Sequence, residues 1–584
     1  MTNERNIPIP SPGDVVTFTI LINGEAIPGT IGIKSIAVAK EVNRISYAQL
    51  SILDGSAAQE NFEVSSGTSF LPGNEIEIQL GYSSDEQTLF KGIITKHGLK
   101  TRRNNSSELR IECRDKAYKM TLNRHSKYFY ELTDGELCEQ MASDNGVETD
   151  TIETDSFTNS SIVQMNVSDW DFLLSRSEAC NKLLFTDDGK LSFRKPDLSG
   201  EPTLSLTYGA NIMEFEAEID ARDQYAAVSG ESWDYTNLEV LTLESANANF
   251  EEAGNLSTVK LSETVGLESL NARHSGQLKT EELQSWIDAR MLKSKLSKIN
   301  GRVSFQGFAG VKPGDLIELE GLGDRFNGNV FVASVNHEVA QGGWITHVQF
   351  GMSRDWFSAH VKGYEDQPAS GVIPAVNGLQ IGIVTALEGD PEGEFRIQVK
   401  LPLISDQDEG IWARVATLDA GGNRGTFFLP EIEDEVVVGF LNDDPRDAII
   451  LGMLNSSSKP AAFEASDDNH VKGYSSRDEL KLVFNDDEKS ITISTPSGNK
   501  LQLSEDSGHL LLEDENGNSI IMDSSGITLE SAADLILKAS GDLKFEGTNI
   551  ELGANAQMKV SGSASTDITS SGSLKIEGSI VQIN

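Results

Sequence analysis

Residues 501–530 read LQLSEDSGHLLLEDENGNSIIMDSSGITLE, and their alternation of apolar and polar side chains continues almost to the end of the chain. Pairs of apolar residues two positions apart recur roughly every eight residues, separated by Gly, Asn, Asp and Ser. The pairs are Leu501/Leu503, Leu510/Leu512, Ile520/Met522, Ile527/Leu529, Leu535/Leu537, Leu543/Phe545, Ile550/Leu552 and Met558/Val560. After Pro496 there is no proline or cysteine, and Phe545 is the only aromatic residue. Such a pattern is typical of a stacked β-solenoid.

A repeat of this length supplies one strand and one turn, which is too little to enclose a core within a single chain. Three chains that each contribute one face of a prism solve the problem, because their Leu and Ile side chains then fill a common axis. We therefore predict that residues 496–584 form a trimeric, intertwined β-prism. Its predicted core residues are Leu501, Leu503, Leu510, Leu512, Ile527, Leu529, Leu535, Leu537, Ile550 and Leu552.

Two other structures remain open for this region. A disordered tail rich in Ser, Gly and Asp would explain the polar composition, but the evenly spaced Leu and Ile pairs argue against it. A single-chain β-helix like those of polysaccharide lyases needs a longer repeat and tends to use aromatic residues in its sugar cleft. The prism ends almost where the chain ends, so its last apolar layer, Ile580 and Ile583, is predicted to need a cap.

The segments before the prism suggest a small barrel between two connections. A connector rich in Ser and Asp spans residues 456–495, and residues 358–376, with Pro368 and Gly371, predict a linker. Between them, residues 377–455 hold six short strand-like stretches: QIGIVTAL, FRIQVKLPL, GIWARVATL, RGTFFLP, DEVVVGFL and AIILGML. Six strands in so short a segment predict an OB-fold domain.

Residues 1–357 predict barrel and helix domains. In the first ~125 residues, strands alternate in TFTILINGEAI, with a turn at Asn23 and Gly24, and in later segments, which favours a small barrel or sandwich. Helices are expected to begin after Thr133 and Ser168, the second with Asp171 in a capping-box pattern. A hairpin is expected at Asp188 and Gly189.

A third helix is predicted from Thr280, with Lys295 and Lys298 in its last turn and Gly301 ending it. Strands then resume and continue to about Phe350. The fold class expected for the whole chain is mainly β with a few helices.

The charge balance limits the possible partners. The chain of 584 residues has 48 Lys and Arg against 90 Asp and Glu, a net charge of -42. Nucleic acids and anionic membranes are recognised by clustered basic residues, so neither is an expected partner. Cys113, Cys138 and Cys180 lie far apart and are predicted to be reduced core residues. No secretory signal or membrane-spanning stretch is visible, so a cytoplasmic origin is expected.

Catalytic motifs are not evident. No HExxH, GxSxG or Walker A sequence occurs, GLGDRF from residue 321 lacks the third glycine of a dinucleotide fingerprint, and GGNRG from residue 421 is interpreted as an OB-fold loop. His337 and His347 are interpreted as structural histidines, and Trp412 as a barrel core residue. We therefore predict no enzyme activity, no metal site and no cofactor.

A long ordered set of residues in the barrel segment resembles the OB domain of the VgrG-type spike family. The residues that carry this resemblance and have a structural role in it are Trp412, Arg414, Gly425, Pro430, Glu431, Asp434, Glu435, Pro445 and Gly452, together with the runs GEFRIQV from residue 393 and FLPE from residue 428. Shorter matches, VSDWDFL from residue 167 and PGD from residue 313, are similar to the hub part of the same family.

The resemblance implies a homotrimeric spike at the tip of a contractile injection system. Its implied partners are a hexameric tube protein of the Hcp type, baseplate proteins, effectors and a PAAR-type cap at Ile580 and Ile583, with the membrane touched only during puncture. The related phage needle carries a lysozyme domain between its OB unit and prism, and this chain has too few residues there to hold one.

A different class of function remains open. A phage-like tailspike that binds or cleaves glycans would share the elongated trimer but would need a groove lined with aromatic residues and carboxylates. Type VI secretion, a free extracellular particle and a phage tail are all compatible with the sequence. In each of them the protein would be assembled into a contractile particle and delivered outside the cell or into a target cell.

Overall fold

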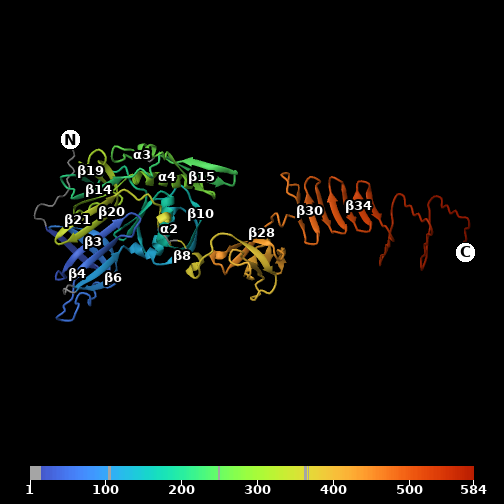
Figure 1. Ribbon diagram of the computed structural model, residues 1–584, viewed down its shortest axis with the longest axis horizontal. Helices are drawn as coiled ribbons and strands as arrows, with labels where there is room; N and C mark the ends of the chain where they lie inside the picture. Colours follow the sequence, from blue (N-terminus) through green and yellow to red (C-terminus); the bar gives the residue numbers. More distant parts are fainter. Residues whose placement is uncertain are drawn as a thin grey trace. The chain divides into compact units, whose positions relative to one another are not determined.

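The computed structural model describes residues 15–102, 107–246, 250–360, 363, 365 and 367–583. The chain divides into two units, Met1–Asn377 with Phe440–Pro445, and Gly378–Gly439 with Arg446–Asn584. Most of the regular structure is strand, with a few helices, so the predicted fold class is confirmed (Figure 1). The predicted absence of a signal sequence concerns residues 1–14, which lie outside the described residues.

The first unit is built on one large sheet of 13 described strands. Along the sheet the order is β14 (Glu214–Ile219), β18 (Ile299–Gln306), β21 (Gly343–Phe350), β20 (Gly328–Ala340), β3 (Ile33–Glu41), β4 (Tyr47–Leu53), β7 (Ser107–Arg114), β6 (Asp85–Thr101), β5 (Glu75–Tyr82), β1 (Val16–Ile22) and β2 (Glu25–Ala26), with β13 (Leu204–Thr207) and β19 (Leu316–Glu320) attached through β20. Each half covers its own core. Leu50 and Ile111 are buried in one core, and Val332 and Val348 are buried in the other.

Helices and three smaller sheets complete the first unit. The strands are β8 (Arg124–Leu132) with β10 (Asn159–Ser168); β9 (Glu148–Ile152), β11 (Leu183–Asp187) and β12 (Lys190–Arg194); and β15 (Ala227–Asp234), β16 (Glu239–Glu244) and β17 (Ser269–His274). The helices are η1 (Lys116–Thr121), α1 (Asp134–Asp144), α2 (Asp169–Ala179), α3 (Thr258–Val265), α4 (Thr280–Leu296), α5 (Phe357–His360) and η2 (Pro368–Gly371).

The predicted starts of the first two helices are confirmed by their capping hydrogen bonds. The Thr133 side chain accepts from the backbone of Glu136, whose carboxylate in turn accepts from the Thr133 backbone at 2.9 Å. Ser168 Oγ accepts from the Asp171 amide at 3.1 Å and donates to its carboxylate. These bonds satisfy amide groups that have no partner within the helix, which is why the boundaries can be read from sequence.

The expected end of the third helix is wrong. Helix α4 ends at Leu296, and Gly301 lies inside strand β18. A side chain at Gly301 would meet the Glu216 carbonyl oxygen at 2.4 Å, so this glycine permits close strand packing instead of ending a helix. Lys298 also lies beyond the helix, where its ammonium group is buried against Glu252 at 2.7 Å.

In the second unit, five described strands close into a barrel: β22 (Gln380–Ala386), β23 (Ile397–Lys400), β24 (Ile411–Val415), β28 (Ala448–Met453) and β27 (Glu435–Phe440). The prediction of six barrel strands is therefore wrong by one. The stretch RGTFFLP supplies only β26 (Arg424–Gly425), which pairs with β25 (Ala420–Gly421) in a hairpin outside the barrel. A short 3-10 helix, η3 (Leu441–Asp443), follows β27.

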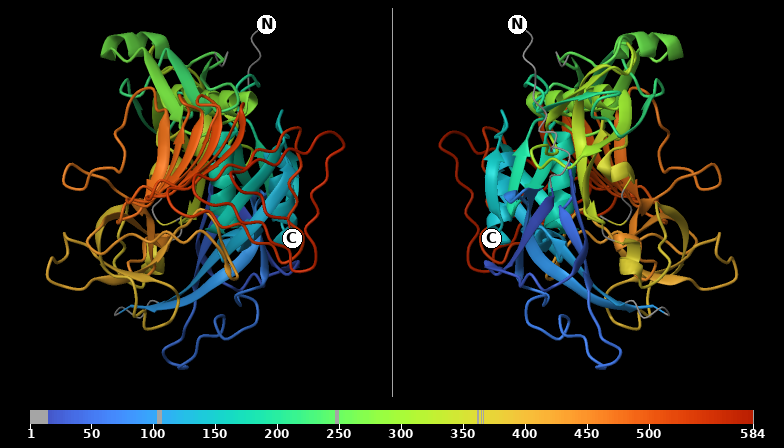
Figure 2. Two further views of the ribbon diagram at one scale, coloured as in Figure 1. Left: turned by 90° about the vertical axis from the view of Figure 1, so that its right-hand side faces the viewer. Right: turned by 90° about the vertical axis from the view of Figure 1, so that its left-hand side faces the viewer.

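A seven-stranded antiparallel sheet follows the barrel, and Figures 1 and 2 show its strands lying side by side. Its strands are β29 (Val471–Ser475), β30 (Lys481–Asn485), β31 (Ser490–Ser494), β32 (Lys500–Ser504), β33 (His509–Glu513), β34 (Ser519–Asp523) and β35 (Gly526–Glu530). The predicted connector at 456–495 is wrong in its second half, because the sheet already begins at Val471.

The last described strand ends at Glu530, although the alternation of apolar and polar residues continues beyond it in the sequence. No strand is present within the described residues 531–583, which are drawn as coil in both figures. Among the described helices, none has the length and apolar character needed to cross a membrane. Cys113, Cys138 and Cys180 are free and buried, as predicted for reduced core residues.

Candidate functional site

The C-terminal sheet gathers its apolar side chains on one face. Leu501 pairs with Leu512, Leu512 with Ile520 and Ile520 with Leu529, so these residues from four strands form one row. A parallel row joins Ile491, Leu503, Leu510, Met522 and Ile527. Directly opposed residues point to the same side of an antiparallel sheet, so both rows share a face.

This face is left uncovered by the described residues. Leu503 is 44% exposed, Leu512 48%, Leu529 52% and Ile527 67%. Two open hollows lie on it: one of about 550 Å³ between Ile493 and Leu535, and one of about 680 Å³ around Leu503 and Met522. Large contiguous apolar surfaces on soluble proteins mark sites of association.

The opposite face is mostly polar, with Thr492 paired to Gln502 and Thr528 paired to Ile521. The turns between strands are held by side-chain hydrogen bonds. Asp514 accepts from the Asn518 side chain at 2.7 Å and from its amide at 2.8 Å, which lowers the pKa of Asp514 to about 2. These hydrogen bonds favour the ionised form of the Asp514 carboxylate.

The remaining predicted core residues lie in the segment without strands. Leu535, Leu537, Ile550 and Leu552 are between 53% and 72% exposed. The predicted cap contacts are more exposed still, Ile580 at 81% and Ile583 at 88%. Repeated aliphatic side chains this exposed lack the packing that their sequence pattern anticipates.

Two residues of the OB motif bind the part of the chain that follows the barrel. Glu431 accepts from Arg477 at 3.1 Å, and Asp434 accepts from Lys459 at 2.9 Å. The rings of Phe428 and Tyr474 pack with their centroids 4.9 Å apart. Glu431 thus contacts the turn between β29 and β30, whereas Asp434 contacts the segment that precedes the sheet.

The other motif residues occupy varied positions around the barrel. Trp412 is half-buried, so its prediction as a core residue is wrong; the adjacent Ala413 faces the interior and is 0% exposed. Arg414 is exposed and Pro430 is buried, while Glu435, Pro445 and Gly452 are half-buried. Gly425 has φ +133°, and a side chain there would meet the Asp419 carbonyl oxygen at 2.4 Å.

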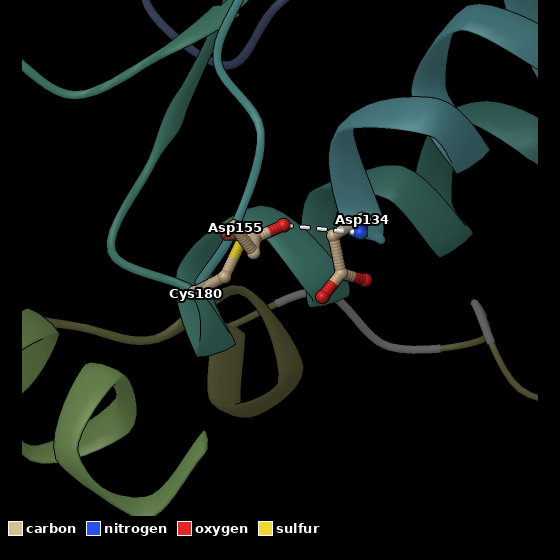
Figure 3. Close-up of side chains that lie close together, drawn as sticks. All are labelled: Asp134, Asp155 and Cys180. Carbon is tan, nitrogen blue, oxygen red and sulfur yellow. Dashed lines mark hydrogen bonds between the residues drawn. The ribbon is translucent and has the colours of Figure 1, made fainter. Parts of the chain in front are cut away.

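One group of potential metal ligands comes together among the described residues: Asp134, Asp155 and Cys180 (Figure 3). Asp134 already receives two hydrogen bonds from Arg176 at 2.6 and 2.8 Å, and Asp155 receives one from Lys182 at 2.5 Å. Burial raises the pKa of the Cys180 thiol well above its usual value, so it stays protonated. The two cationic side chains supply the positive charge that a metal would bring, and the group is a buried ion-pair network.

His337 and His347 lie on neighbouring strands, but they point to opposite faces of the sheet. His337 pairs with Thr346 and shares a hydrogen bond with its hydroxyl at 3.0 Å, whereas His347 pairs with Asn336. Burial lowers the pKa of His337 to about 3, so it is neutral at physiological pH. Two imidazoles on opposite faces cannot share a ligand.

Three family models match successive parts of the chain. Residues 12–341, more than half of the 584, match the Alg8 N-terminal domain. Residues 380–454 match the type VI secretion system/phage-baseplate injector OB domain, and residues 490–584 match the phage baseplate V C-terminal trimerisation domain. The chain belongs to the Alg8 N-terminal domain family and is a spike protein of the VgrG type.

Curated relatives of this VgrG-type spike are themselves described as spike proteins. Type VI secretion system spike protein VgrG1b of Pseudomonas aeruginosa is 28% identical over 190 residues, 30% of this chain and 25% of the relative. Spike protein VgrG1a of the same organism is 26% identical over 214 residues, 34% of this chain and 33% of the relative. The VgrG-type spike thus spans a quarter to a third of the length of these relatives.

Among solved structures, the VgrG-type spike aligns with the 43 kDa tail protein of prophage MuSo2 from Shewanella oneidensis. The alignment covers 57% of this chain and 98% of that one, at 11% identity and a TM-score of 0.43.

Proposed function

We propose that this VgrG-type spike is a homotrimeric structural component of a contractile injection system, in which three C-terminal sheets pack their apolar faces around a common axis. The observation that carries the proposal is the row of Leu501, Leu512 and Leu529 on a face that no described residue covers. The match of residues 490–584 to a trimerisation domain supports the number three. Fully burying one aliphatic side chain contributes about 1.5–3 kcal/mol, so each layer contributes several kcal/mol.

The proposed role is mechanical and not enzymatic. The relatives are described as spike proteins, and the description of the N-terminal family names a domain and no reaction. In this role the first unit joins a hexameric tube of the Hcp type and the baseplate, and a PAAR-type cap covers Ile580 and Ile583. The particle carries effectors to a target cell, with the protein made in the bacterial cytoplasm before assembly.

Light scattering coupled to size-exclusion chromatography of the full-length chain tests this proposal. A mass three times that of the chain is expected, together with resistance of the trimer to SDS at room temperature. A monomer at micromolar concentration would refute the proposal, as would cleavage of a glycan by the purified protein, which the tailspike alternative predicts. Deletion of residues 471–584 is expected to give a monomer, because it removes the whole apolar face.

A further inference from the structure

The chain contains six asparagines that are each followed directly by glycine. This dipeptide is chemically reactive, because glycine has no side chain to shield its backbone nitrogen from the side-chain amide of the residue before it. For that nitrogen to attack the side-chain carbonyl carbon, the asparagine side chain must be free to turn toward it. The six asparagines are Asn23, Asn145, Asn300, Asn327, Asn377 and Asn516.

Hydrogen bonds hold five of these six asparagines. The Oδ1 atom accepts from a backbone amide at 2.9 Å in both Asn23 and Asn327. The side chain of Asn145 donates to a carbonyl oxygen at 2.9 Å and to a carboxylate at 2.8 Å, and that of Asn300 donates to a carbonyl oxygen at 2.7 Å. Asn516 donates to a carboxylate at 3.4 Å, and the nitrogen of the glycine after it donates to a carbonyl oxygen at 3.2 Å. Each of these five must break a hydrogen bond before it can react.

Asn377 lacks these restraints. Neither its side chain nor the Gly378 nitrogen forms a hydrogen bond with any described residue, and both residues are exposed. Gly378 has φ +78°, and outside its chain neighbours no heavy atom lies within 4 Å of the place that a Cβ would take. Both residues precede strand β22, which begins at Gln380. The dipeptide also spans the point at which the chain passes from the first unit to the second.

We propose that Asn377 is a site of spontaneous deamidation through a succinimide. The Gly378 nitrogen gives up its proton and bonds to Cγ of Asn377, and the bond from Cγ to the side-chain nitrogen breaks. That nitrogen takes up a proton and leaves as ammonia. One water molecule then opens the five-membered ring at either of its two carbonyl carbons. The products are aspartate and isoaspartate, and in isoaspartate the main chain runs through Cβ and Cγ.

The modification changes both the charge and the covalent structure of the chain. Either product adds one negative charge to a chain whose net charge is already -42. Isoaspartate also adds one carbon atom to the main chain at the point where the first unit ends and the second begins. The reaction takes place within a single chain, so this inference does not rest on the proposed trimer.

Peptide mapping by liquid chromatography and mass spectrometry tests the site, with the full-length protein aged in a warm, mildly alkaline buffer. Peptides with aspartate and isoaspartate elute separately and differ in mass from the asparagine peptide. Asn377 is expected to react at least about tenfold faster than each of the other five, because a held asparagine reacts only from a locally opened state. A tenfold difference corresponds to about 1.4 kcal/mol of opening free energy. Equal rates at the six sites, or no reaction at Asn377, would overturn the inference.

The unfolded chain is the first control, because glycine follows every one of the six asparagines. In denaturant all six are expected to react at similar rates. A preference for Asn377 that persisted there would show that the fold is not its cause, which would overturn the inference. Asn377→Gln is expected to abolish isoaspartate at this position, because its longer side chain must close a less favourable six-membered ring. The matched variant Asn516→Gln should leave the rate at Asn377 unchanged.

Two further measurements check the route and keep it separate from the proposed function. The rate at Asn377 should rise with pH, because the attacking nitrogen must lose its proton. Aspartate without isoaspartate would mean that water attacks the side chain directly, and would overturn the succinimide route. Light scattering is expected to give the same mass for fresh and aged protein. A monomer in both would refute the proposed function and leave this inference standing.

Discussion

The N-terminal half of the large sheet and the C-terminal sheet are both antiparallel, and both alternate apolar with polar residues. In the first, Leu50 and Ile52 on β4 are 0% exposed, because the sheet curls around a core of its own. In the second, Leu503 and Leu512 are 44% and 48% exposed, because the described residues form a single layer of five-residue strands here and leave this face open. The same alternation of apolar and polar residues therefore indicates burial within one chain for the large sheet. For the C-terminal sheet it indicates burial between the chains of the proposed assembly.

The largest expected effect is loss of the proposed trimer through a change on the apolar face of the C-terminal sheet. Changing Leu512 to Asp places three carboxylates at the axis of the proposed trimer, and burying charges of like sign without partners costs several kcal/mol each. We expect Leu512→Asp to abolish the trimer, as measured by light scattering.

The matched control is Gln502→Asp, which lies on the neighbouring strand but on the polar face. It is expected to leave the mass unchanged. Loss of the trimer in both variants would show that the two faces do not differ, contrary to the comparison.

A truncation in the first unit is the next largest effect. Leu50→Ala leaves a cavity in a closed core, and such changes cost about 2–5 kcal/mol. Denaturant unfolding followed by a signal from the first unit should show this loss, while the mass of the assembly stays that of the wild type. A loss below about 1 kcal/mol would mean that this core is loosely packed.

The two regions also differ in the direction in which the pKa of an aspartate is shifted. Burial raises the pKa of Asp115, in the first unit, from 3.8 to about 6, whereas Asp514 in the C-terminal sheet has a pKa of about 2. Between pH 3.8 and about pH 6, Asp115 is mostly protonated in the folded state and mostly ionised in the unfolded state, so the folded state binds more protons. Its unfolding free energy therefore falls as pH rises from about 4 to 6, by about 3 kcal/mol.

Asp115→Asn removes this titration. The difference in unfolding free energy between wild type and variant should shift in favour of the variant across that pH range, superimposed on a constant loss from altered hydrogen bonds to Ala117 and Gly189. A pH-independent difference would contradict the raised pKa. Trimer mass should not change over the same range.

The smallest effect is the loss of one helix cap. Ser168→Ala removes the bond from the Asp171 amide at the start of α2, which typically costs about 1 kcal/mol. Thermal unfolding of the first unit should register this cost, and Ser168→Thr, whose hydroxyl can still accept from the Asp171 amide and donate to its carboxylate, should avoid most of it.

Features set by neighbouring residues could be predicted from the sequence. The caps at Thr133 and Ser168 and the hairpin at Asp188 and Gly189 depend on bonds and φ angles within a few residues. The apolar rows of the C-terminal sheet were predictable for the same reason, since a period of two repeats at every strand. The early start of that sheet was missed, although Leu482 with Phe484 continues the pattern.

Features set by distant residues could not be predicted. Gly301 resembles a helix stop in sequence, yet its role depends on Glu216, far away in the chain. The stretch RGTFFLP alternates like a strand, but the barrel closes without it through a parallel pairing of β24 with β28.

The described residues 531–583 form no strands, so their backbone groups lack the hydrogen bonds of a sheet. Folding of this segment therefore depends on when other chains arrive as well as on where they lie. Under the proposed assembly, its backbone groups find partners only when sibling chains arrive, so a lone chain has no intermediate in which this part is folded. The sheet ahead of it aligns the three chains first, and winding then proceeds toward the tip. Pulling one chain out afterwards means breaking many layers at once, so the finished shaft persists because it comes apart slowly.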